Sequence, residues 1–420
     1  MALIETEFMD LSRDLDPEAF WAENGLCHRI GEDKPRCALA GVGSDDHWLF
    51  EFLAVPSTLR YYRDKAWRDG LHRQANDLMW QHLRARPYDE DSWEHQPKRI
   101  ENLFGCEFAY HEGGTPWFVP VTADPGEFAR ILDRAEAIDI ESWCLPDAYL
   151  AEWERRRTNG QRMPHLGTGS RGPATVITSV LDPQVALLWC IDEPELMDRF
   201  TRILTQGYLR LNRRLRAFSC DQQERAPSGG DGIESAQPMP SRIRSGSDGS
   251  EPRQSPGVGP QGRRGKAPEA GWWITDDNSC LFNPRQYRRF CMPVLRTVMD
   301  EFAPLPDGHR YQHSDSAMAH HLDAQRELGI ASVNYGPEID PRIIRARMPE
   351  AVINGHMPPF LLRNGSPEAI RARVRADFTA VGAGGRLNIA TAGSIPAGTG
   401  IGRLRWLMRC VELETRYRAA

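Results

Sequence analysis

The C-terminal half of the chain alternates short apolar runs with longer segments whose apolar residues recur at helical spacing. Each apolar run ends in polar residues, and the segment after it is long enough for a helix of roughly 10 to 20 residues. Strands that alternate with helices predict a parallel sheet covered by helices. The five predicted strands lie within residues 271–277, 309–316, 330–336, 351–360 and 386–396.

Two α/β architectures fit this alternation, a (β/α)8 TIM barrel and a doubly wound open sheet. No G-x-G-x-x-G follows the first predicted strand, which disfavours a dinucleotide-binding doubly wound sheet. In a barrel, the C-terminal ends of the strands form one face, and that face contains the active site. The polar strand ends suit this face, so we predict the barrel.

The N-terminal half has a weaker pattern. Residues 47–56, 114–125 and 174–181 resemble strands, and residues 57–85 and 124–138 resemble helices. The first 44 residues have no clear period. We therefore predict an N-terminal extension at 1–44, packed outside a barrel that spans 45–420.

Residues 221–270 differ in composition from the rest of the chain. They consist mostly of Pro, Gly, Ser and charged residues and have almost no apolar content. Such a segment cannot bury enough apolar surface to offset the entropy lost on ordering. We predict a disordered insertion between a helix and the strand at 271–277.

Composition excludes several classes of protein. The 420 residues have a formal net charge of −6, which argues against a nucleic-acid-binding surface. A membrane-spanning helix needs about 18 consecutive apolar residues, and the sequence contains no run of that length. The acidic N-terminus also lacks the apolar core of a secretory signal. We expect a cytoplasmic protein. Nine cysteines without a C-x-x-C pair are expected to be small buried hydrophobes rather than a disulfide framework.

Residues 309–321 contain four histidines and, between them, a His-Ser-Asp sequence. His313 and Asp315 lie at i and i+2, on one face of a predicted strand. They are candidates for a metal-ligand pair or an acid–base pair; the alternative is a hydrogen-bonded pair that orients a loop. His320 and His321 point about 100° apart on a helix, so we expect them to be structural.

A second acidic pair, Asp276 and Asp277, ends the strand at 271–277. Two carboxylates this close raise one pKa, which suits acid catalysis. The alternative is that one of them caps the next helix.

Other polar residues at strand ends are candidates for contact with a substrate. His356 titrates near neutrality as an acid or base, or else bonds to the backbone. Arg171, within the glycine-rich GTGSRGPAT, lies either at an anion site or in an ordinary βα loop. The remaining candidates for substrate binding are Asn334, Tyr335, Glu338, Asn354 and Ser394.

Four stretches, taken in order, resemble the uroporphyrinogen decarboxylase superfamily. They are RGPATVITSVLDPQVALLWCIDEPELMDRFTRIL, ITDDNSCLFNPRQYRRFCMPVLRTVMDEF, INGHMPPFLLRNGSPEAIRARV and LNIATAGSIPAGTGIGRLRWLM. The resemblance extends over about residues 45–420 without the insertion. It implies a (β/α)8 barrel and one of two chemistries, which are decarboxylation of uroporphyrinogen without a cofactor and zinc-dependent methyl transfer between a corrinoid and a thiol.

The sequence departs from both branches. The decarboxylases resemble one another through an Arg-Gln-Ala-Gly-Arg loop near the N-terminus, and here only Arg60 and Arg63 stand near its place. The methyltransferases have His-x-Cys after the fifth strand and a cysteine after the eighth. The corresponding stretches here read His-Ser-Asp at 313–315 and Ala-Gly-Ser at 392–394, so both sulfurs are missing. His and Asp with a hydroxyl would make a harder, weaker metal site.

Our first hypothesis is a methyltransferase-like enzyme nearer the corrinoid branch than the housekeeping decarboxylase. His313 and Asp315 would hold zinc or move a proton, with a corrinoid as substrate and a corrinoid protein as a candidate partner. The alternatives are metal-free decarboxylation of uroporphyrinogen or a related polycarboxylate in porphyrin biosynthesis, without a cofactor, and a non-catalytic tetrapyrrole- or corrinoid-binding barrel. We expect neither nucleic acid nor a membrane as a partner. The sequence leaves open whether the chain forms a homodimer.

Overall fold

The computed structural model describes residues 4–43, 46–161, 163–224 and 271–417. The strands are β1 Ala38–Leu39, β2 Phe108–Ala109, β3 Trp117–Phe118, β4 Gly169–Arg171, β5 Gly271–Thr275, β6 His309–Ser314, β7 Ser332–Tyr335, β8 Val352–Asn354 and β9 Leu387–Ile389. Five short helical turns are η1 Glu101–Phe104, η2 Asp277–Leu281, η3 Tyr287–Cys291, η4 Ala319–His321 and η5 Ala383–Gly385.

Helices account for most of the remaining described chain. They are α1 Thr6–Leu11, α2 Pro17–Asn24, α3 Asp46–Phe52, α4 Thr58–Arg63, α5 Lys65–Leu83, α6 Pro125–Ala137, α7 Ile140–Trp143, α8 Asp147–Thr158, α9 Pro173–Val180, α10 Pro183–Asp192, α11 Pro194–Glu224, α12 Pro284–Gln286, α13 Met292–Phe302, α14 Leu322–Glu327, α15 Pro341–Arg347, α16 Pro359–Asn364, α17 Pro367–Val381 and α18 Ile401–Glu414.

Many helices begin at an Asp-Pro pair. The side chains of Asp16, Asp124, Asp182 and Asp340 each accept a hydrogen bond from a backbone N–H in the first turn of the helix that follows. Each aspartate caps the helix, and the proline after it fixes the first helical φ without losing a useful donor. These starts are therefore specified locally by the sequence.

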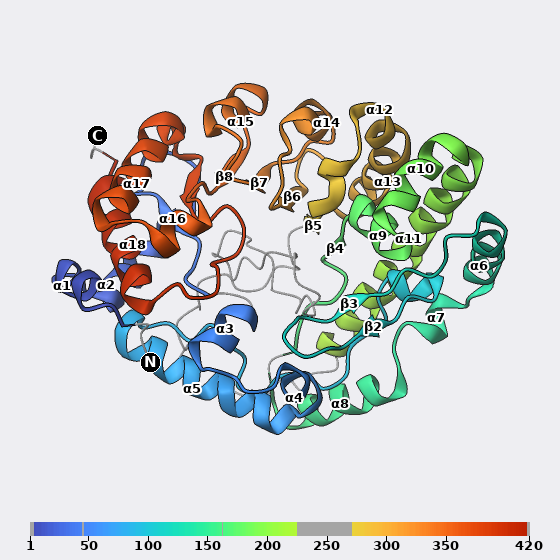
Figure 1. Ribbon diagram of the computed structural model, residues 1–420, viewed down its shortest axis with the longest axis horizontal. Coiled ribbons are helices and arrows are strands. Elements are labelled where there is room, and N and C mark those ends of the chain that lie inside the picture. The colour runs from blue at the N-terminus through green and yellow to red at the C-terminus, as the bar shows by residue number, and fades with distance from the viewer. Residues whose placement is uncertain (1–3, 44–45, 162, 225–270, 418–420) are drawn as a thin grey trace.

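Seven parallel strands form one sheet in the order β1-β9-β8-β7-β6-β5-β4. Neighbours in space are neighbours in sequence, except that the first strand pairs with the last, Ala38 opposite Asn388. That pairing curls the sheet back on itself, whereas a doubly wound sheet reverses its strand order at a switch point. The predicted α/β class and barrel architecture are confirmed, and Figure 1 shows the helices as a ring around the strands.

The described strands leave the barrel wall open at one place. β4 and β1 are the two edges of the sheet and are not paired with each other. The segment 89–101 lines a cavity together with β4, so it lies where an eighth strand would pair. β2 and β3 form a separate antiparallel hairpin that does not join the barrel sheet.

Three parts of the N-terminal prediction need correction. Residues 47–52 and 174–180, within segments predicted to be strands, lie in helices α3 and α9. Every residue of α9 is buried, and its polar residues Thr175, Thr178 and Ser179 bond inside the protein, so no solvent-facing stripe marks a helical period. β1 lies within the predicted extension 1–44 but belongs to the barrel sheet; a strand of two residues is too short to give a periodic signal.

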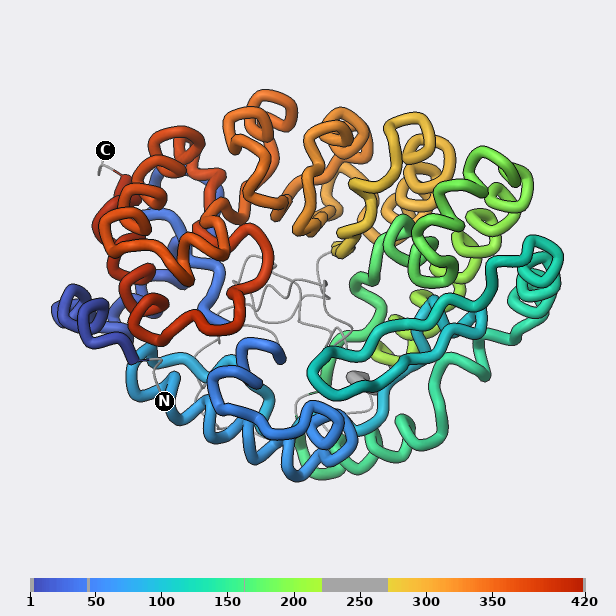
Figure 2. The backbone as a smooth tube through the Cα atoms, in the orientation of Figure 1, coloured from blue at the N-terminus to red at the C-terminus, as the bar shows by residue number. Residues whose placement is uncertain are grey.

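The rest of that N-terminal segment does pack on the outside. α1 contacts α18, and α2 contacts both α18 and α5. Figure 2 shows this blue N-terminal tube against the red C-terminal helices. The predicted insertion at 221–270 begins too early, because α11 continues to Glu224; the remainder, 225–270, lies outside the described residues.

One continuous hydrophobic core fills the space between the helices and the sheet, and seven of the nine cysteines are buried in the protein, as expected of small hydrophobes. Among the helices described, none alone is long and apolar enough to cross a membrane. The pair α9 and α10 together meets the length and composition test, but the two helices are bent by 102°.

Candidate functional site

Two adjacent strands bring the candidate acids and histidine together. β5 ends at Thr275, which pairs with His313 of β6. Asp277 therefore follows β5 at nearly the level where Asp315 follows β6, because parallel neighbours end at the same edge of the sheet. The C-terminal ends of β5 and β6 thus place three side chains side by side.

Asp277, His313 and Asp315 form a compact cluster. One ligand atom from each of them lies within 4.8 Å of the others. His313 Nε2 is 2.7 Å from Asp315 Oδ1 and 3.9 Å from Asp277 Oδ1. His313 is fully buried, whereas the Asp315 side chain is 25% exposed. The cluster therefore has a buried floor and an edge that solvent reaches.

Backbone contacts fix the geometry of the two acids. Asp277 Oδ1 accepts a hydrogen bond of 2.9 Å from the backbone nitrogen of Asp315. Ser316 Oγ donates a bond of 2.8 Å to the backbone oxygen of Asp277. Asp277 Oδ2 is buried, and among the described residues it has no hydrogen-bond partner. A buried carboxylate oxygen without a partner is costly, which suits a site that completes its coordination with a cation.

The electrostatics of the cluster favour a bound positive charge. Burial raises the pKa of Asp277, and the Asp315 carboxylate raises it further, although His313 opposes the shift. Burial by itself lowers the pKa of His313, but the carboxylates of Asp315 and Asp277 outweigh it and raise that pKa above its ordinary value. Two carboxylates facing one imidazole hold either a proton or a metal ion.

Asp276, the other acid of the pair, has a separate position. Its Oδ1 accepts a bond of 2.8 Å from the backbone nitrogen of Thr175, in the first turn of α9. A Cβ on Gly172 would lie 2.2 Å from Asp276 Cγ, so only glycine permits this approach. Burial raises the pKa of Asp276 to about 7. Asp276 therefore caps α9, an earlier helix rather than the next one that we predicted, and lies outside the three-residue cluster.

The loops after β7, β8 and β9 are tied to one another through asparagines. Asn334 donates to the backbone oxygens of Asn354 and Thr391, and its Oδ1 accepts from the Gly393 nitrogen at 3.1 Å. Asn354 donates to Ser332 Oγ at 2.7 Å and accepts from Asn388 at 2.9 Å. Both amides therefore bond to the protein, and the structure gives them a positioning role at the strand ends.

Gly393 brings the loop after β9 against the cluster. Its φ is +100°, and a Cβ there would lie 2.8 Å from Asp315 Oδ1. The neighbouring Ser394 is half-buried in this loop. The loop after β9, which corresponds to the place of the second cysteine in the methyltransferases that the sequence resembles, therefore approaches Asp315 through Gly393.

Tyr335 ends β7 and Glu338 follows it, in different environments. Tyr335 is buried, no hydrogen-bond partner for its hydroxyl lies in the described part of the chain, and burial raises its pKa. Glu338 is exposed, and its Oε2 lies over Gly336. Both stay candidates for substrate contact.

Three other histidines contact the backbone. His356 Nε2 lies 2.6 Å from the Ile339 oxygen, and burial lowers its pKa to about 4. His321 Nε2 lies 2.9 Å from the Ser279 oxygen, and His320 Nε2 lies 3.3 Å from that of Phe282. These contacts favour the backbone-bonded interpretation of His356 and the structural one of His320 and His321.

Arg171 forms a buried ion pair that the sequence did not suggest. Its Nη1 donates to Glu101 Oε1 at 2.9 Å, and its guanidinium lies 4.8 Å from the centre of the Trp117 ring. The Arg171 charge lowers the pKa of Asp277, although less than burial raises it. Sequence reasoning missed Glu101 because it lies 70 residues away along the chain.

Sequence reasoning also missed that Asp277 joins His313 and Asp315 in one cluster. The sequence presents Asp277 as an acid beside Asp276 and offers a serine as the third donor. The strand pairing was the missing signal: once β5 and β6 are aligned with Thr275 opposite His313, Asp277 faces the His313–Asp315 pair.

The donor set of the cluster fits a divalent metal. One imidazole and two carboxylates are common ligands of zinc and of other first-row divalent ions. In the described part of the chain, no cysteine belongs to the cluster. A thiolate-rich zinc site therefore does not fit these residues, but a harder nitrogen–oxygen site does.

Comparisons with known proteins agree with the barrel. The model of the uroporphyrinogen decarboxylase (URO-D) family matches residues 270–413. Among solved structures, a methyltransferase from Methanosarcina mazei is similar, with a TM-score of 0.51 and 14% identity, covering 93% of this chain and 96% of that one. At this identity the likeness shows the fold alone. No curated protein matches the chain in sequence. The predicted resemblance to the URO-D superfamily is confirmed.

Proposed function

We propose that this chain of the URO-D superfamily is an enzyme that holds a divalent metal on Asp277, His313 and Asp315 and transfers a methyl group. The donor would be a corrinoid or a methylated small molecule, and the acceptor a small thiol. The convergence of the three ligand atoms within 4.8 Å carries the proposal. The shared fold with a methyltransferase supports the choice among barrel chemistries.

The three residues differ in burial and would have different roles in the proposed site. Asp277 orders the backbone of Asp315 from inside the site, and Asp315 lies at the exposed edge where a substrate enters. His313 has a raised pKa, so it would release a proton when a cation binds. The metal, when bound, supplies Lewis-acid activation and lowers the pKa of a coordinated thiol or water.

The first experiment measures metal content. The purified protein is loaded with zinc, dialysed and analysed, beside His313→Ala and His320→Ala. We expect about one equivalent in the wild type and in His320→Ala, and a loss in His313→Ala. His320 is the matched control because it is an exposed histidine of the same segment outside the cluster.

The second experiment tests the reaction. The loaded protein is mixed with methylcobalamin and a small thiol, and the cobalamin absorbance follows loss of the methyl group. Demethylation that needs both the thiol and His313 supports the proposal. Metal bound without any transfer contradicts the reaction while keeping the metal site.

Decarboxylation is the second candidate, and Asp276 favours it. A buried carboxyl with a pKa of about 7 can keep its proton near neutrality and donate it to a carbon that has lost carbon dioxide. If neither the wild type nor the two variants bind metal, the next assay measures release of carbon dioxide from uroporphyrinogen or a smaller polycarboxylate. If neither reaction occurs, a binding function for the barrel remains.

A further inference from the structure

A cavity lies beside β4, at the edge of the sheet where no described strand pairs with it. Its volume is about 330 Å³, and its walls come from the segment 89–101, from β4 and from α11. None of the three cluster residues lines it. Small-molecule sites begin at about 300 Å³, so the cavity suits a single-ring compound rather than a tetrapyrrole.

The walls of the cavity combine flat aromatic surface with positive charge. Trp93, Tyr149 and Trp273 contribute rings. The charged lining residues are Lys98, Arg99 and Arg171 against Asp89 and Glu101. Arg171 is already paired with Glu101 at 2.9 Å, so the charges of these two residues offset each other. Lys98 and Arg99 then outnumber Asp89, and the remaining charged lining residues have a net positive charge.

Lys98 is the cation most available to a ligand. Its side chain is half-buried in the lining, and within the described ranges no ion pair is found for its Nζ. The Lys98 backbone nitrogen donates a hydrogen bond of 2.9 Å to the Cys144 oxygen, which fixes the main chain at this position. A half-buried ammonium group without a carboxylate partner suits an anionic ligand.

Two buried donors of the lining residues also have no partner in the described part of the chain. They are Arg171 Nη2 and Trp273 Nε1. Neighbouring atoms cover both, so a ligand would reach them through a small rotation of either side chain. An acceptor placed there would satisfy donors that otherwise remain unpaired. Both of these buried groups are donors, which points to a ligand rich in acceptors.

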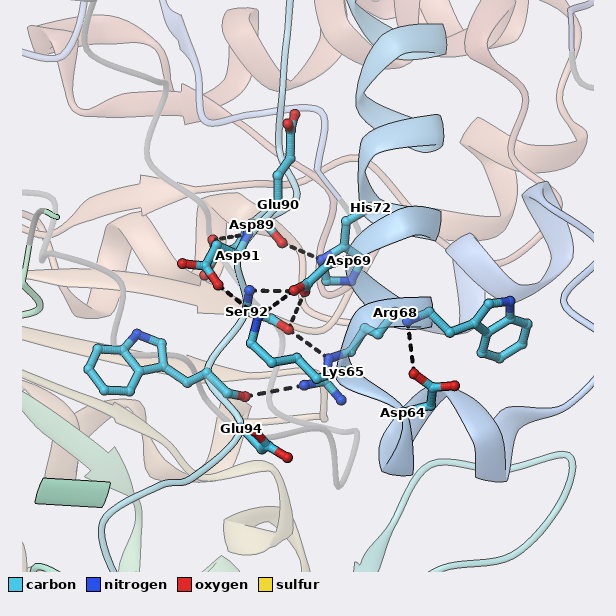
Figure 3. A network of polar contacts seen from close by, with 12 residues as sticks. Asp64, Lys65, Arg68, Asp69, His72, Asp89, Glu90, Asp91, Ser92 and Glu94 are labelled. Carbon is cyan, nitrogen blue, oxygen red and sulfur yellow. Dashed lines mark hydrogen bonds and ion pairs between the residues drawn. The ribbon is translucent and has the colours of Figure 1, made fainter. Parts of the chain in front are cut away.

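Figure 3 shows how the wall opposite β4 is fixed in place. Asp69 of α5 accepts from the backbone nitrogen of Ser92 at 3.0 Å, and Lys65 bridges Asp69 and Asp91. His72 contacts the backbone oxygen of Asp89 at 2.6 Å. The segment that carries Trp93 is thereby held rigid, so the aromatic wall is formed before a ligand arrives.

We propose that this cavity binds a small aromatic anion, a single ring bearing a carboxylate or a phosphate. The ring packs against the aromatic wall formed by Trp93, Tyr149 and Trp273, in which the Trp93 and Tyr149 rings already contact each other at 5.2 Å between centroids, and the anion faces Lys98 with Arg171 beyond it. β4 pairs Arg171 with Thr275, two residues before Asp277, so the anionic end lies toward the metal cluster. The inference concerns binding and does not require the proposed methyl transfer.

Calorimetric titration of the full chain tests the cavity with four probes: benzoate, phenyl phosphate, inorganic phosphate and the uncharged benzamide. We expect benzoate or phenyl phosphate to bind at least about tenfold tighter than benzamide. The stronger of the two identifies carboxylate or phosphate as the anion. Inorganic phosphate that binds as tightly as phenyl phosphate overturns the aromatic part of the proposal.

Variants locate the binding. Lys98→Gln removes the charge and Trp273→Phe removes the indole nitrogen but keeps a ring; each is expected to weaken anion binding about fivefold or more. Arg285→Gln, which removes an exposed arginine outside the lining, leaves it unchanged. Thermal unfolding confirms that each variant is folded. Equal affinity for benzoate and benzamide, or unchanged binding in both Lys98→Gln and Trp273→Phe, overturns the proposal.

The same titration in His313→Ala separates the two proposals. Binding that persists without the metal ligand supports a cavity independent of the cluster, even if methyl transfer proves wrong. Binding that is lost in folded His313→Ala assigns the anion to the cluster and overturns the cavity.

Discussion

The Asp277 carboxylate accepts a hydrogen bond of 2.9 Å from the backbone nitrogen of Asp315, so one candidate metal ligand holds the backbone of another. The two acids come from different strand ends, and this bond fixes their spacing before any ligand binds. A site organised in this way loses little entropy on binding a cation. It also keeps two carboxylates close together in a buried place, which costs stability.

The Asp277→Asn variant separates these two effects, the favourable organisation of the metal site and the unfavourable repulsion between two buried carboxylates. Asparagine keeps an oxygen that accepts from the Asp315 nitrogen but removes a buried negative charge. In metal-free protein at pH 8 we expect the free energy of unfolding to rise by about 1 to 2 kcal/mol. Zinc affinity should fall by about tenfold or more, because a neutral amide replaces a carboxylate ligand.

The measurements are urea unfolding without metal and zinc titration. Asp276→Asn is the control, since Asp276 is the adjacent buried acid outside the cluster. It should keep its zinc. A loss of stability in metal-free Asp277→Asn would contradict the repulsion argument.

Gly393→Ala should weaken the metal site through sterics. Its Cβ would lie 2.8 Å from Asp315 Oδ1, and the φ of +100° disfavours any side chain. Gly384→Ala is the matched control, since its φ of +75° carries a comparable strain but nothing lies within 4 Å of the added atom. Both should lose about 1 to 2 kcal/mol of stability, and Gly393→Ala should lose more.

Zinc titration distinguishes the two alanine variants. Only Gly393→Ala should bind zinc more weakly. Equal zinc affinity in both would mean that the loop after β9 can move away from Asp315 without disturbing it.

His356 should make the protein sensitive to acid. Its pKa is lowered to about 4 in the folded state, against about 6.5 in an unfolded chain. As the pH falls below 6.5 the unfolded state takes up the proton first, so stability is lost between pH 6.5 and about 4. At pH 5 the loss from this group is about 2 kcal/mol.

The comparison is the drop in unfolding free energy from pH 7 to pH 5 in the wild type and in His356→Gln. The glutamine amide nitrogen takes the place of Nε2, so it can donate to the Ile339 oxygen but does not titrate. The drop should be smaller by about 2 kcal/mol in His356→Gln. An equal drop in both proteins would remove His356 as its cause.

Asp69→Ala should destabilise the protein strongly. Asp69 is buried and bonds both to Ser92 and to Lys65, so its removal leaves the Ser92 nitrogen without its partner and Lys65 with Asp91 alone. We expect a loss of about 3 kcal/mol. Asp64→Ala, which removes an exposed cap of the same helix, should cost about 1 kcal/mol.

Chemical denaturation measures both losses, and hydrogen exchange at residues 92–94 reports on the wall of the cavity. Faster exchange there in Asp69→Ala alone is expected. Similar losses of unfolding free energy in the two variants would show that the buried network stabilises the protein no more than the helix cap does.

The sequence by itself determined the alternating half of the fold. Five strands and the helices after them follow from local periodicity, and the Asp-Pro pairs mark where several helices begin. The shared face of His313 and Asp315 also follows from the two-residue repeat of a strand. These are properties of neighbouring residues, so they can be recognised without knowing the fold.

Tertiary structure decided the rest. The sequence of α9 resembles a strand because all of its residues are buried, its polar ones included, and its cap comes from Asp276, about a hundred residues further along the chain. Asp277 joined the cluster, and Glu101 met Arg171, only through contacts between separate segments. Such contacts depend on how strands pair and how the barrel curls, and no local repeat in the chain encodes that register.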